Sequence, residues 1–162
     1  MGDSLMKKIV LTILVFPFIL IANEKSWPGT TFTEVKAFHW PLKISKRSLI
    51  SNEFELVPGA INKAGVKLNK DQVKILQRSV VNKFPPHPAA ACYSPHNVFV
   101  FYNGKKPVAF IEICFDCLGY RSFPKAPADN FDLLSIAKIC QQLKIPFGSD
   151  KDLKSLESFL KE

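Results

Sequence analysis

Two apolar, aromatic-rich runs on either side of Asn103-Gly104 constrain the fold more than any other feature of this chain. Residues 98–102 precede the pair and residues 108–115 follow it. Asn and Gly both tolerate positive φ, and an Asn-Gly pair between two such runs is typical of a tight hairpin turn. The sequence therefore predicts a β-hairpin over residues 96–115.

Cysteine and histidine residues flank this hairpin at its open end. Cys92-x3-His96 comes before the first strand, and Cys114-x2-Cys117 ends the second. A four-residue loop over residues 103–106 sets Cys92 opposite Cys117, and a two-residue loop moves the pairing by only two positions. In either register the four side chains come together.

One interpretation of this cluster is a metal site. Two short chelating segments with these spacings match a tetrahedral Zn²⁺ site, which makes Cys92, His96, Cys114 and Cys117 the candidate ligands. In a straight strand Cys114 and Cys117 would point to opposite faces. The chain must therefore turn at residues 115–116 if both thiols are to face inward.

The competing interpretation is a disulfide, because thiols of an exported protein meet oxidants. Cys114–Cys117 and Cys92–Cys117 are both open as pairs. A catalytic redox pair is a special case, but no helix N-terminus is predicted there and Asp116 would raise a thiol pKa. A Cys-His hydrolase using Cys92, His96 and Glu112 is a further alternative. Cys140 is predicted to be a packed free thiol.

The N-terminus predicts export. Lys7-Lys8, the apolar run over residues 9–21 and Ala22 have the order of a secretory signal peptide, assigned to residues 1–22. The apolar run is shorter than the ~20 residues that span a bilayer. We therefore expect no transmembrane span after cleavage, and a single periplasmic or secreted domain over residues 23–162.

Weaker patterns place the remaining elements. Residues 32–40 predict a strand containing His39, and Asn69 with Gln72 predicts a capped helix start. A second helix is predicted from Asp129, after a loop over residues 118–128 that contains two prolines. Ser149 and Asp152 cap a third, and His87 is predicted to be exposed. The class is α+β: a small antiparallel sheet centred on the 96–115 hairpin, with about three packed helices.

The charge distribution is uneven. The chain has 22 basic and 14 acidic residues, a net charge of +8, and residues 36–83 hold ten of the basic and three of the acidic ones. Lys70, Lys74 and Arg78 recur every fourth position of the first helix. This indicates an anionic envelope component or an acidic protein as partner, whereas nucleic acid is not expected outside the cytoplasm. The alternative is a solvated helix face.

Three stretches resemble a family of small exported bacterial proteins of uncharacterised function. They are Cys92-Tyr-x-Pro-His, Val-Phe-Tyr-Asn-Gly-Lys-x-Pro-Val-Ala-x-Ile-x-Ile-Cys-Phe-x-Cys and Ile-Pro-Phe-Gly, within roughly residues 68–148. The resemblance implies export and a shared site at Cys92, Pro95, His96, Cys114 and Cys117, and it implies no activity. Asn97 departs from the family, which has a second basic or imidazole residue there.

Two functional hypotheses follow. The first is an exported, non-enzymatic binding or envelope-associated domain whose Cys/His cluster is structural. The second is a thiol-redox or zinc-dependent enzyme that uses the same four residues. A structural site consumes and shields its ligands, whereas a catalytic site keeps an open position beside a pocket.

Overall fold

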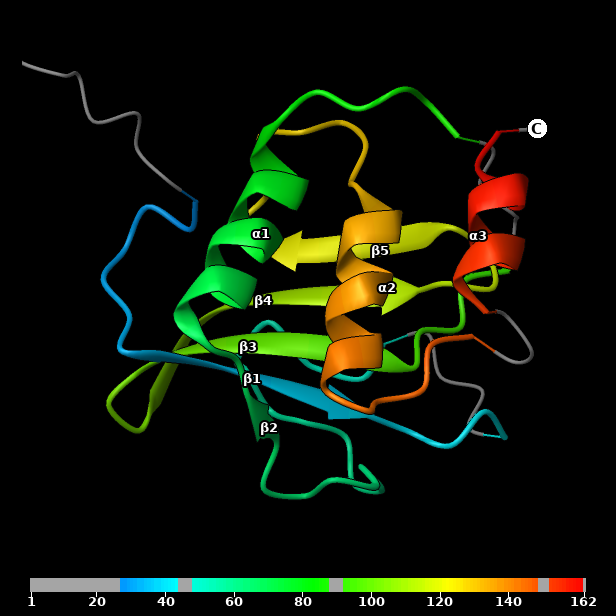
Figure 1. Cartoon of the computed structure of the whole chain (residues 1–162). Helices are drawn as coiled ribbons and strands as arrows, with labels where there is room; N and C mark the ends of the chain where they lie inside the picture. The colour runs from blue at the N-terminus through cyan, green and yellow to red at the C-terminus, as the bar shows by residue number, and fades with distance from the viewer. Residues whose placement is uncertain (1–26, 44–47, 88–91, 149–151, 162) are drawn as a thin grey trace, which may run out of the picture.

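A five-stranded antiparallel sheet and three helices form the fold of the described residues, and the predicted α+β class is confirmed. The computed structural model describes residues 27–43, 48–87, 92–148 and 152–161. The strands are β1 Glu34–His39, β2 Val66–Lys67, β3 Asn97–Asn103, β4 Lys106–Cys114 and β5 Gly119–Phe123; the helices are α1 Lys70–Val81, α2 Leu133–Gln142 and α3 Leu153–Phe159. The strand order is β2-β1-β3-β4-β5 (Figure 1).

The predicted hairpin is the centre of this sheet. Tyr102 pairs with Pro107 as expected, and the ladder continues to Asn103 opposite Lys106, so that Gly104 and Lys105 alone make the turn. Gly104 has φ +60°, a conformation that favours glycine. A bulge between Phe101 and Tyr102 then shifts the register by one residue along the rest of the hairpin.

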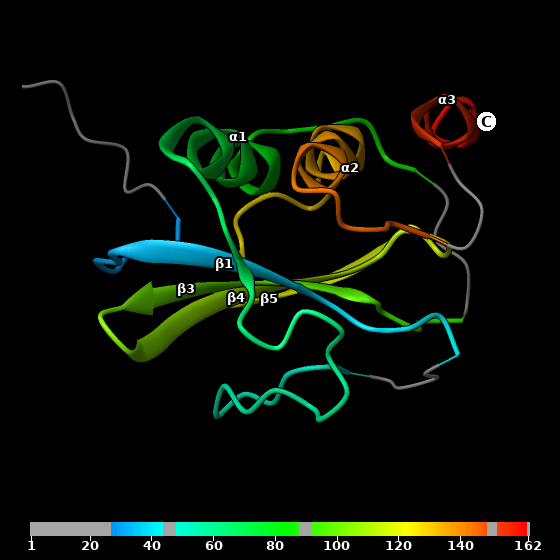
Figure 2. The same cartoon turned by 60° about the horizontal axis from the view of Figure 1, so that its bottom comes forward.

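Each face of the sheet is covered by a different layer. Helices α1 and α2 lie side by side on one face, and an irregular segment over residues 48–62, called the strap below, lies on the other (Figure 2). Leu49 and Ile50 of the strap are buried against Val98 and Phe110. Phe99 and Ile111, their neighbours in sequence, pack into the core on the helix side. Burial on both faces explains why β3 and β4 are continuously apolar instead of alternating.

The first helix begins where the sequence predicts. The Asn69 side chain accepts a hydrogen bond from the Gln72 backbone, and the Gln72 side chain accepts one from the Asn69 backbone. This reciprocal pair satisfies two amides that the first helical turn leaves free. Leu76 and Val80 then bury the inner face of α1 in the core on the helix side.

Three expectations were wrong. Residues 118–128 are not all loop, because Gly119–Phe123 pairs with β4 as β5. The second helix is capped by Asp132, whose carboxylate accepts from the Ser135 amide at 2.9 Å, and not by Asp129. The carbonyl of Asp129 instead accepts a hydrogen bond from the Tyr120 hydroxyl. His87 is half-buried, with its ring 5.9 Å from that of Tyr120, and is not an exposed loop residue.

Other expectations lie partly outside the described residues. Asp152 caps α3 as predicted, through the Ser155 amide, while Ser149 and the signal peptide over residues 1–22 are not described. Among the helices of the described ranges, none is long and apolar enough to cross a membrane.

Candidate functional site

The turn between β4 and β5 brings Cys114 and Cys117 together. Cys114 is the last residue of β4, and residues 115–118 reverse the chain so that Cys114 pairs with Gly119. In a straight strand the two thiols would point to opposite faces, and this turn is what allows them to meet, as the sequence analysis required. The two residues form a disulfide, and each is 1% exposed. Of the two disulfide pairs considered from the sequence, the structure contains Cys114–Cys117.

Cys92 precedes a residue that packs beside this turn, but it is not bonded to either cysteine of the turn. Its thiol is free and exposed. The next residue, Tyr93, lies against Gly119: a Cβ added to Gly119 would come within 2.7 Å of the Tyr93 ring and 3.4 Å of the Cys117 Sγ. Glycine at 119 therefore leaves room for Tyr93 beside the disulfide.

His96 is buried at the same end of the sheet. Its backbone amide donates to Ile113 and its carbonyl accepts from Trp40, which continues β3 toward both neighbouring strands. The side chain is 8% exposed, and its Nδ1 atom has no hydrogen-bond partner. Burial lowers the pKa of His96, and the nearby Asp116 carboxylate opposes that shift.

His39 has a similar environment at the end of β1. Burial lowers its pKa, and a hydrogen bond with Asn62 acts in the opposite direction. The backbone amide of His39 donates to the Asn62 side chain at 2.9 Å, and its Nδ1 atom has no hydrogen-bond partner among the described residues. We expect both imidazoles to be neutral at pH 7.

The structure does not assemble the four predicted ligands into a metal site. Two of them are joined in a disulfide and Cys92 is an exposed free thiol. Across the described ranges, no group of three or more His, Cys, Asp and Glu side chains is placed to hold a metal ion. The arrangement therefore favours the disulfide interpretation of Cys114 and Cys117 over the zinc interpretation.

A buried ion pair lies two residues from the disulfide. Glu112 of β4 is 0% exposed, and its carboxylate accepts from the Arg121 guanidinium of β5 at 3.0 Å. It also accepts from the backbone amide of Leu49 and, at 3.2 Å, from the Tyr93 hydroxyl. Burial and the adjacent Glu112 raise the pKa of that hydroxyl well above its usual range, so Tyr93 is a neutral donor.

This ion pair fastens the strap to the sheet. Arg121 Nη2 donates to the Ser48 hydroxyl and the Ile50 carbonyl, and Nη1 reaches Asn52 Oδ1 at 3.4 Å. The guanidinium plane lies 4.9 Å from the Phe110 ring centre. Among the described residues, the hydrogen-bond partners of the Glu112 carboxylate do not include His96, so the structure gives no support to a Cys92–His96–Glu112 hydrolase.

Sequence reasoning found Glu112 but not its role. The signal was present, since a single carboxylate in the apolar run of β4 needs a buried cation. The partner was missed because Arg121 fell in a segment predicted to be a loop.

Cys140 is buried as predicted, and burial raises the pKa of its thiol to about 12.

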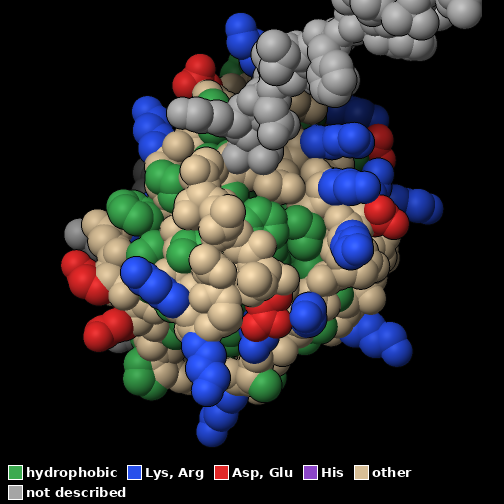
Figure 3. Space-filling view, turned by 90° about the vertical axis from the view of Figure 1, so that its left-hand side faces the viewer, with side chains coloured by type: hydrophobic (Ala, Val, Ile, Leu, Met, Phe, Trp, Pro, Cys, Tyr) green, Lys and Arg blue, Asp and Glu red, His purple; other side chains and the backbone are tan. Residues whose placement is uncertain are grey.

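The predicted basic residues of α1 are exposed. We call Lys70, Lys74 and Arg78 the basic stripe; all three lie on the solvent side of the helix, and none forms an ion pair with a residue in the described ranges. Figure 3 shows Lys and Arg side chains in a column along its right-hand margin, toward the helix layer. By contrast, Lys36 and Lys67 both pair with Glu34.

Comparison with known proteins gives no relationship: no family model, curated protein or solved structure matches this chain. The resemblance to a family of small exported proteins therefore stays a prediction.

Proposed function

We propose that this protein is an exported binding domain of the cell envelope, in which the basic stripe contacts an anionic envelope component and the Cys114–Cys117 disulfide is structural. The observation that carries the proposal is the stripe itself. Three cations at i, i+4 and i+8 lie along one exposed helix face without an acidic partner in the described ranges. Unpaired cations in a row attract a polyanion additively.

The state of the cysteines supports a binding role over a catalytic one. Both sulfurs of the disulfide are shielded, whereas a catalytic pair needs an accessible thiolate at a helix N-terminus or beside a cation. Asp116 lies between the two cysteines in sequence and would oppose thiolate formation. The described residues near the disulfide are engaged in packing and hydrogen bonds that hold the strands and the strap.

Charge removal tests the proposal. We expect the triple substitution Lys70→Gln, Lys74→Gln and Arg78→Gln to weaken binding to phosphatidylglycerol vesicles or an anionic envelope polysaccharide at low salt. Each cation near an anionic surface contributes about 1 kcal/mol, so the loss on vesicles should approach roughly a hundredfold. Co-sedimentation across a salt series measures it, because the contribution of exposed charges falls as the Debye length shortens.

A matched control removes the same charge elsewhere. Lys138, Lys144 and Lys154 are also exposed, and replacing all three with Gln changes the net charge equally. Binding should fall much less in this variant than in the α1 variant. Equal losses in the two variants would mean that net charge and not the stripe governs binding, and undiminished binding in the α1 variant would leave the stripe as a solvated helix face.

A thiol-redox enzyme is the second candidate, and the Cys-x2-Cys disulfide is the observation that favours it. The two functions differ in how readily this bond is reduced. A catalytic pair exchanges with glutathione at potentials near those of the known oxidoreductases, whereas a structural disulfide resists the glutathione pool.

A further inference from the structure

Cys92, Cys114 and Cys117 differ in how solvent can reach them. The two cysteines of the Cys114–Cys117 disulfide are each 1% exposed, whereas Cys92 is an exposed free thiol. A reductant in solution must bring its own thiolate against a sulfur of the bond that it cleaves. Burial therefore protects the disulfide from direct attack and leaves Cys92 as the accessible thiol of the three.

The residue after Cys92 lies directly against the disulfide turn. A Cβ built on Gly119 would be 2.7 Å from the Cδ2 atom of the Tyr93 ring and 3.4 Å from the Cys117 Sγ. The ring and this sulfur therefore border the same small space, the one that a side chain at position 119 would fill. Successive Cα atoms are about 3.8 Å apart, so the backbone of Cys92 begins one residue from that ring.

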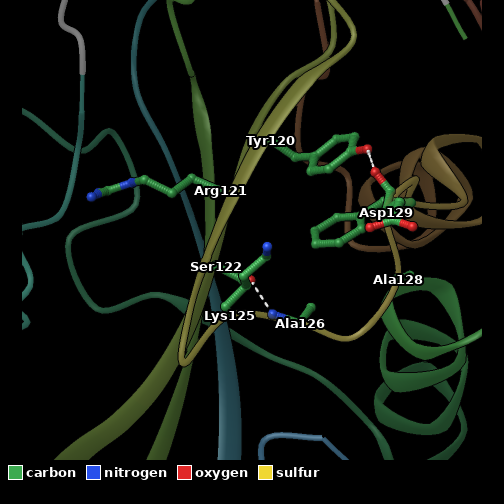
Figure 4. Close-up of a pocket in the computed structure, with 8 residues that line it drawn as sticks. Tyr120, Arg121, Ser122, Lys125, Ala126, Ala128 and Asp129 are labelled. Carbon is green, nitrogen blue, oxygen red and sulfur yellow. Dashed lines mark hydrogen bonds between the residues drawn. The ribbon is translucent and has the colours of Figure 1, made fainter.

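Tyr93 crosses the strap side of the β4–β5 pair. Gly119 and Arg121 are two residues apart in β5 and so face the same side of the sheet. Figure 4 shows Arg121 pointing away from Tyr120, and its guanidinium bonds to the strap. The Tyr93 ring extends on this side from Gly119 to the Glu112 carboxylate, which accepts from the Tyr93 hydroxyl at 3.2 Å. The hydrogen bond anchors the Tyr93 side chain beside the disulfide.

Cys92 lies at the start of a segment without regular secondary structure. Residues 92–96 lead into β3 and belong to no strand or helix. The Tyr93 hydroxyl is held by Glu112, and the His96 amide donates to the Ile113 carbonyl. A backbone rotation between Cys92 and Tyr93 would therefore redirect the Cys92 side chain while leaving the strand ladder unchanged.

We propose that Cys92 is the residue through which the buried disulfide exchanges with thiols outside the protein. The Cys92 thiolate attacks the Cys117 Sγ, the Cys92–Cys117 bond forms and the Cys114–Cys117 bond breaks. The electron pair of the broken bond stays on the Cys114 Sγ, which takes up a proton from water in place of the one that Cys92 released. One disulfide replaces another, so this step needs neither an oxidant nor a reductant.

The new bond is open to solvent where the old one is shielded. It contains the sulfur of an exposed residue, so an external dithiol can attack the Cys92 Sγ, release the Cys117 thiolate and close to its own disulfide. The dithiol is thereby oxidised, and the three cysteines become thiols. This relay sets the rate at which the disulfide responds to its surroundings, and it leaves the reduction potential unchanged because the initial and final states are the same.

Reduction kinetics of the native protein test this role. Excess dithiothreitol, acid quenching, alkylation and intact mass follow the loss of the Cys114–Cys117 bond. Cys92→Ser should slow this loss by about tenfold or more, because the reductant must then wait for the turn to open. Cys140→Ala is the matched control: it removes a buried thiol and should leave the rate unchanged. The Cys92-dependent rate should not vary with protein concentration, since the first step occurs within one molecule.

Two further variants identify the sulfur that is attacked. Cys114→Ser leaves Cys92 and Cys117, which we expect to bond to each other in a glutathione redox buffer. Cys117→Ser leaves Cys92 and Cys114, and here we expect a mixed disulfide between Cys92 and glutathione instead. Peptide mapping after acid quenching distinguishes these products.

Three results would overturn the proposal. One is an equal reduction rate in the parent and in Cys92→Ser, a variant that changes only an exposed side chain. Another is a folded Cys114→Ser variant that forms the mixed disulfide alone. The third is a Cys92–Cys114 bond in Cys117→Ser, which would assign the attack to the other sulfur. If Cys114→Ser fails to fold, the reduction kinetics decide. Substitution of the basic stripe should leave these rates unchanged, which separates this role from the function proposed above.

Discussion

Glu112 is a buried carboxylate whose partners come from three separate segments. Arg121, Tyr93 and the strap amide of Leu49 all donate to it. We expect Glu112→Ala to lower the free energy of unfolding by about 3 kcal/mol, because it leaves these buried donors without an acceptor. Glu112→Gln should cost less, since an amide oxygen still accepts and Arg121 is 34% exposed and can reach water. Urea unfolding followed by tryptophan fluorescence measures both changes.

A surface carboxylate provides the control for that experiment. Glu34 also contacts two cations, Lys36 and Lys67, but on the exposed side of β1. Glu34→Gln should therefore change stability much less than Glu112→Ala. A loss at Glu34 equal to that at Glu112 would contradict the view that burial makes the Glu112 pair important.

The histidines make stability depend on pH. Burial lowers the pKa of His39, His87 and His96 below the ordinary value of 6.5. Between the folded pKa and 6.5 the unfolded chain binds more protons, so stability rises with pH there and is lost as pH falls. We expect the urea midpoint to decrease on going from pH 7.5 to pH 5.5. The variant His39→Gln with His96→Gln should show a shallower decrease, and an unchanged slope would exclude these two groups as its source.

At the scale of an element, the disulfide closes one short turn. A loop of four residues gains about 2 kcal/mol from such a bond in the chain-entropy description. We expect the reduced protein to stay folded but to be less stable by that amount, and the reduction potential to lie below about −300 mV. The intact mass with and without reductant counts the disulfide bonds. The same masses recorded during a titration with a dithiol give the reduction potential of the Cys114–Cys117 bond.

Thiol labelling in the same samples checks the other cysteines. Cys92 should react with iodoacetamide in the native protein, and Cys140 only after unfolding. A potential near that of glutathione would support the redox alternative. Two bonds in the oxidised protein would contradict the assignment of Cys92 and Cys140 as free thiols.

The elements predicted from sequence are those that local chemistry determines. The hairpin and the start of α1 were predicted correctly, from the Asn103-Gly104 pair and the capping pair of Asn69 and Gln72, although the turn itself consists of Gly104 and Lys105. β5 was missed because Gly119 and Pro124 at its ends are typical of loops, and only pairing with β4 makes it a strand. Asp129 and Asp132 are equally suitable caps in sequence, but the Asp132 amide donates to the Ser79 carbonyl of α1 and the helix begins directly after it, so Asp132 is the cap.

For the whole molecule, the sequence predicted the buried sheet better than the segments that cover its two faces. Continuous apolar runs in β3 and β4 indicated a buried sheet, but they could not show that an irregular strap covers one face. The same limit applies to the candidate site. The hairpin turn predicted that the Cys/His pair before β3 meets the cysteine pair at the end of β4. Whether Cys92 joins Cys117 depends instead on the tight β4–β5 turn, which bonds Cys117 to Cys114.

The position of Glu112 also bears on how the chain selects one alignment of its strands. A slip of β4 by one residue would exchange the two faces of the strand and place this carboxylate among the side chains beneath α1 and α2, away from Arg121. Uniformly apolar strands tolerate such slips, because either face can be buried. A single carboxylate in β4 makes a misaligned sheet costly, because the slip would bury it away from Arg121, so Glu112 favours one register of the sheet over the others.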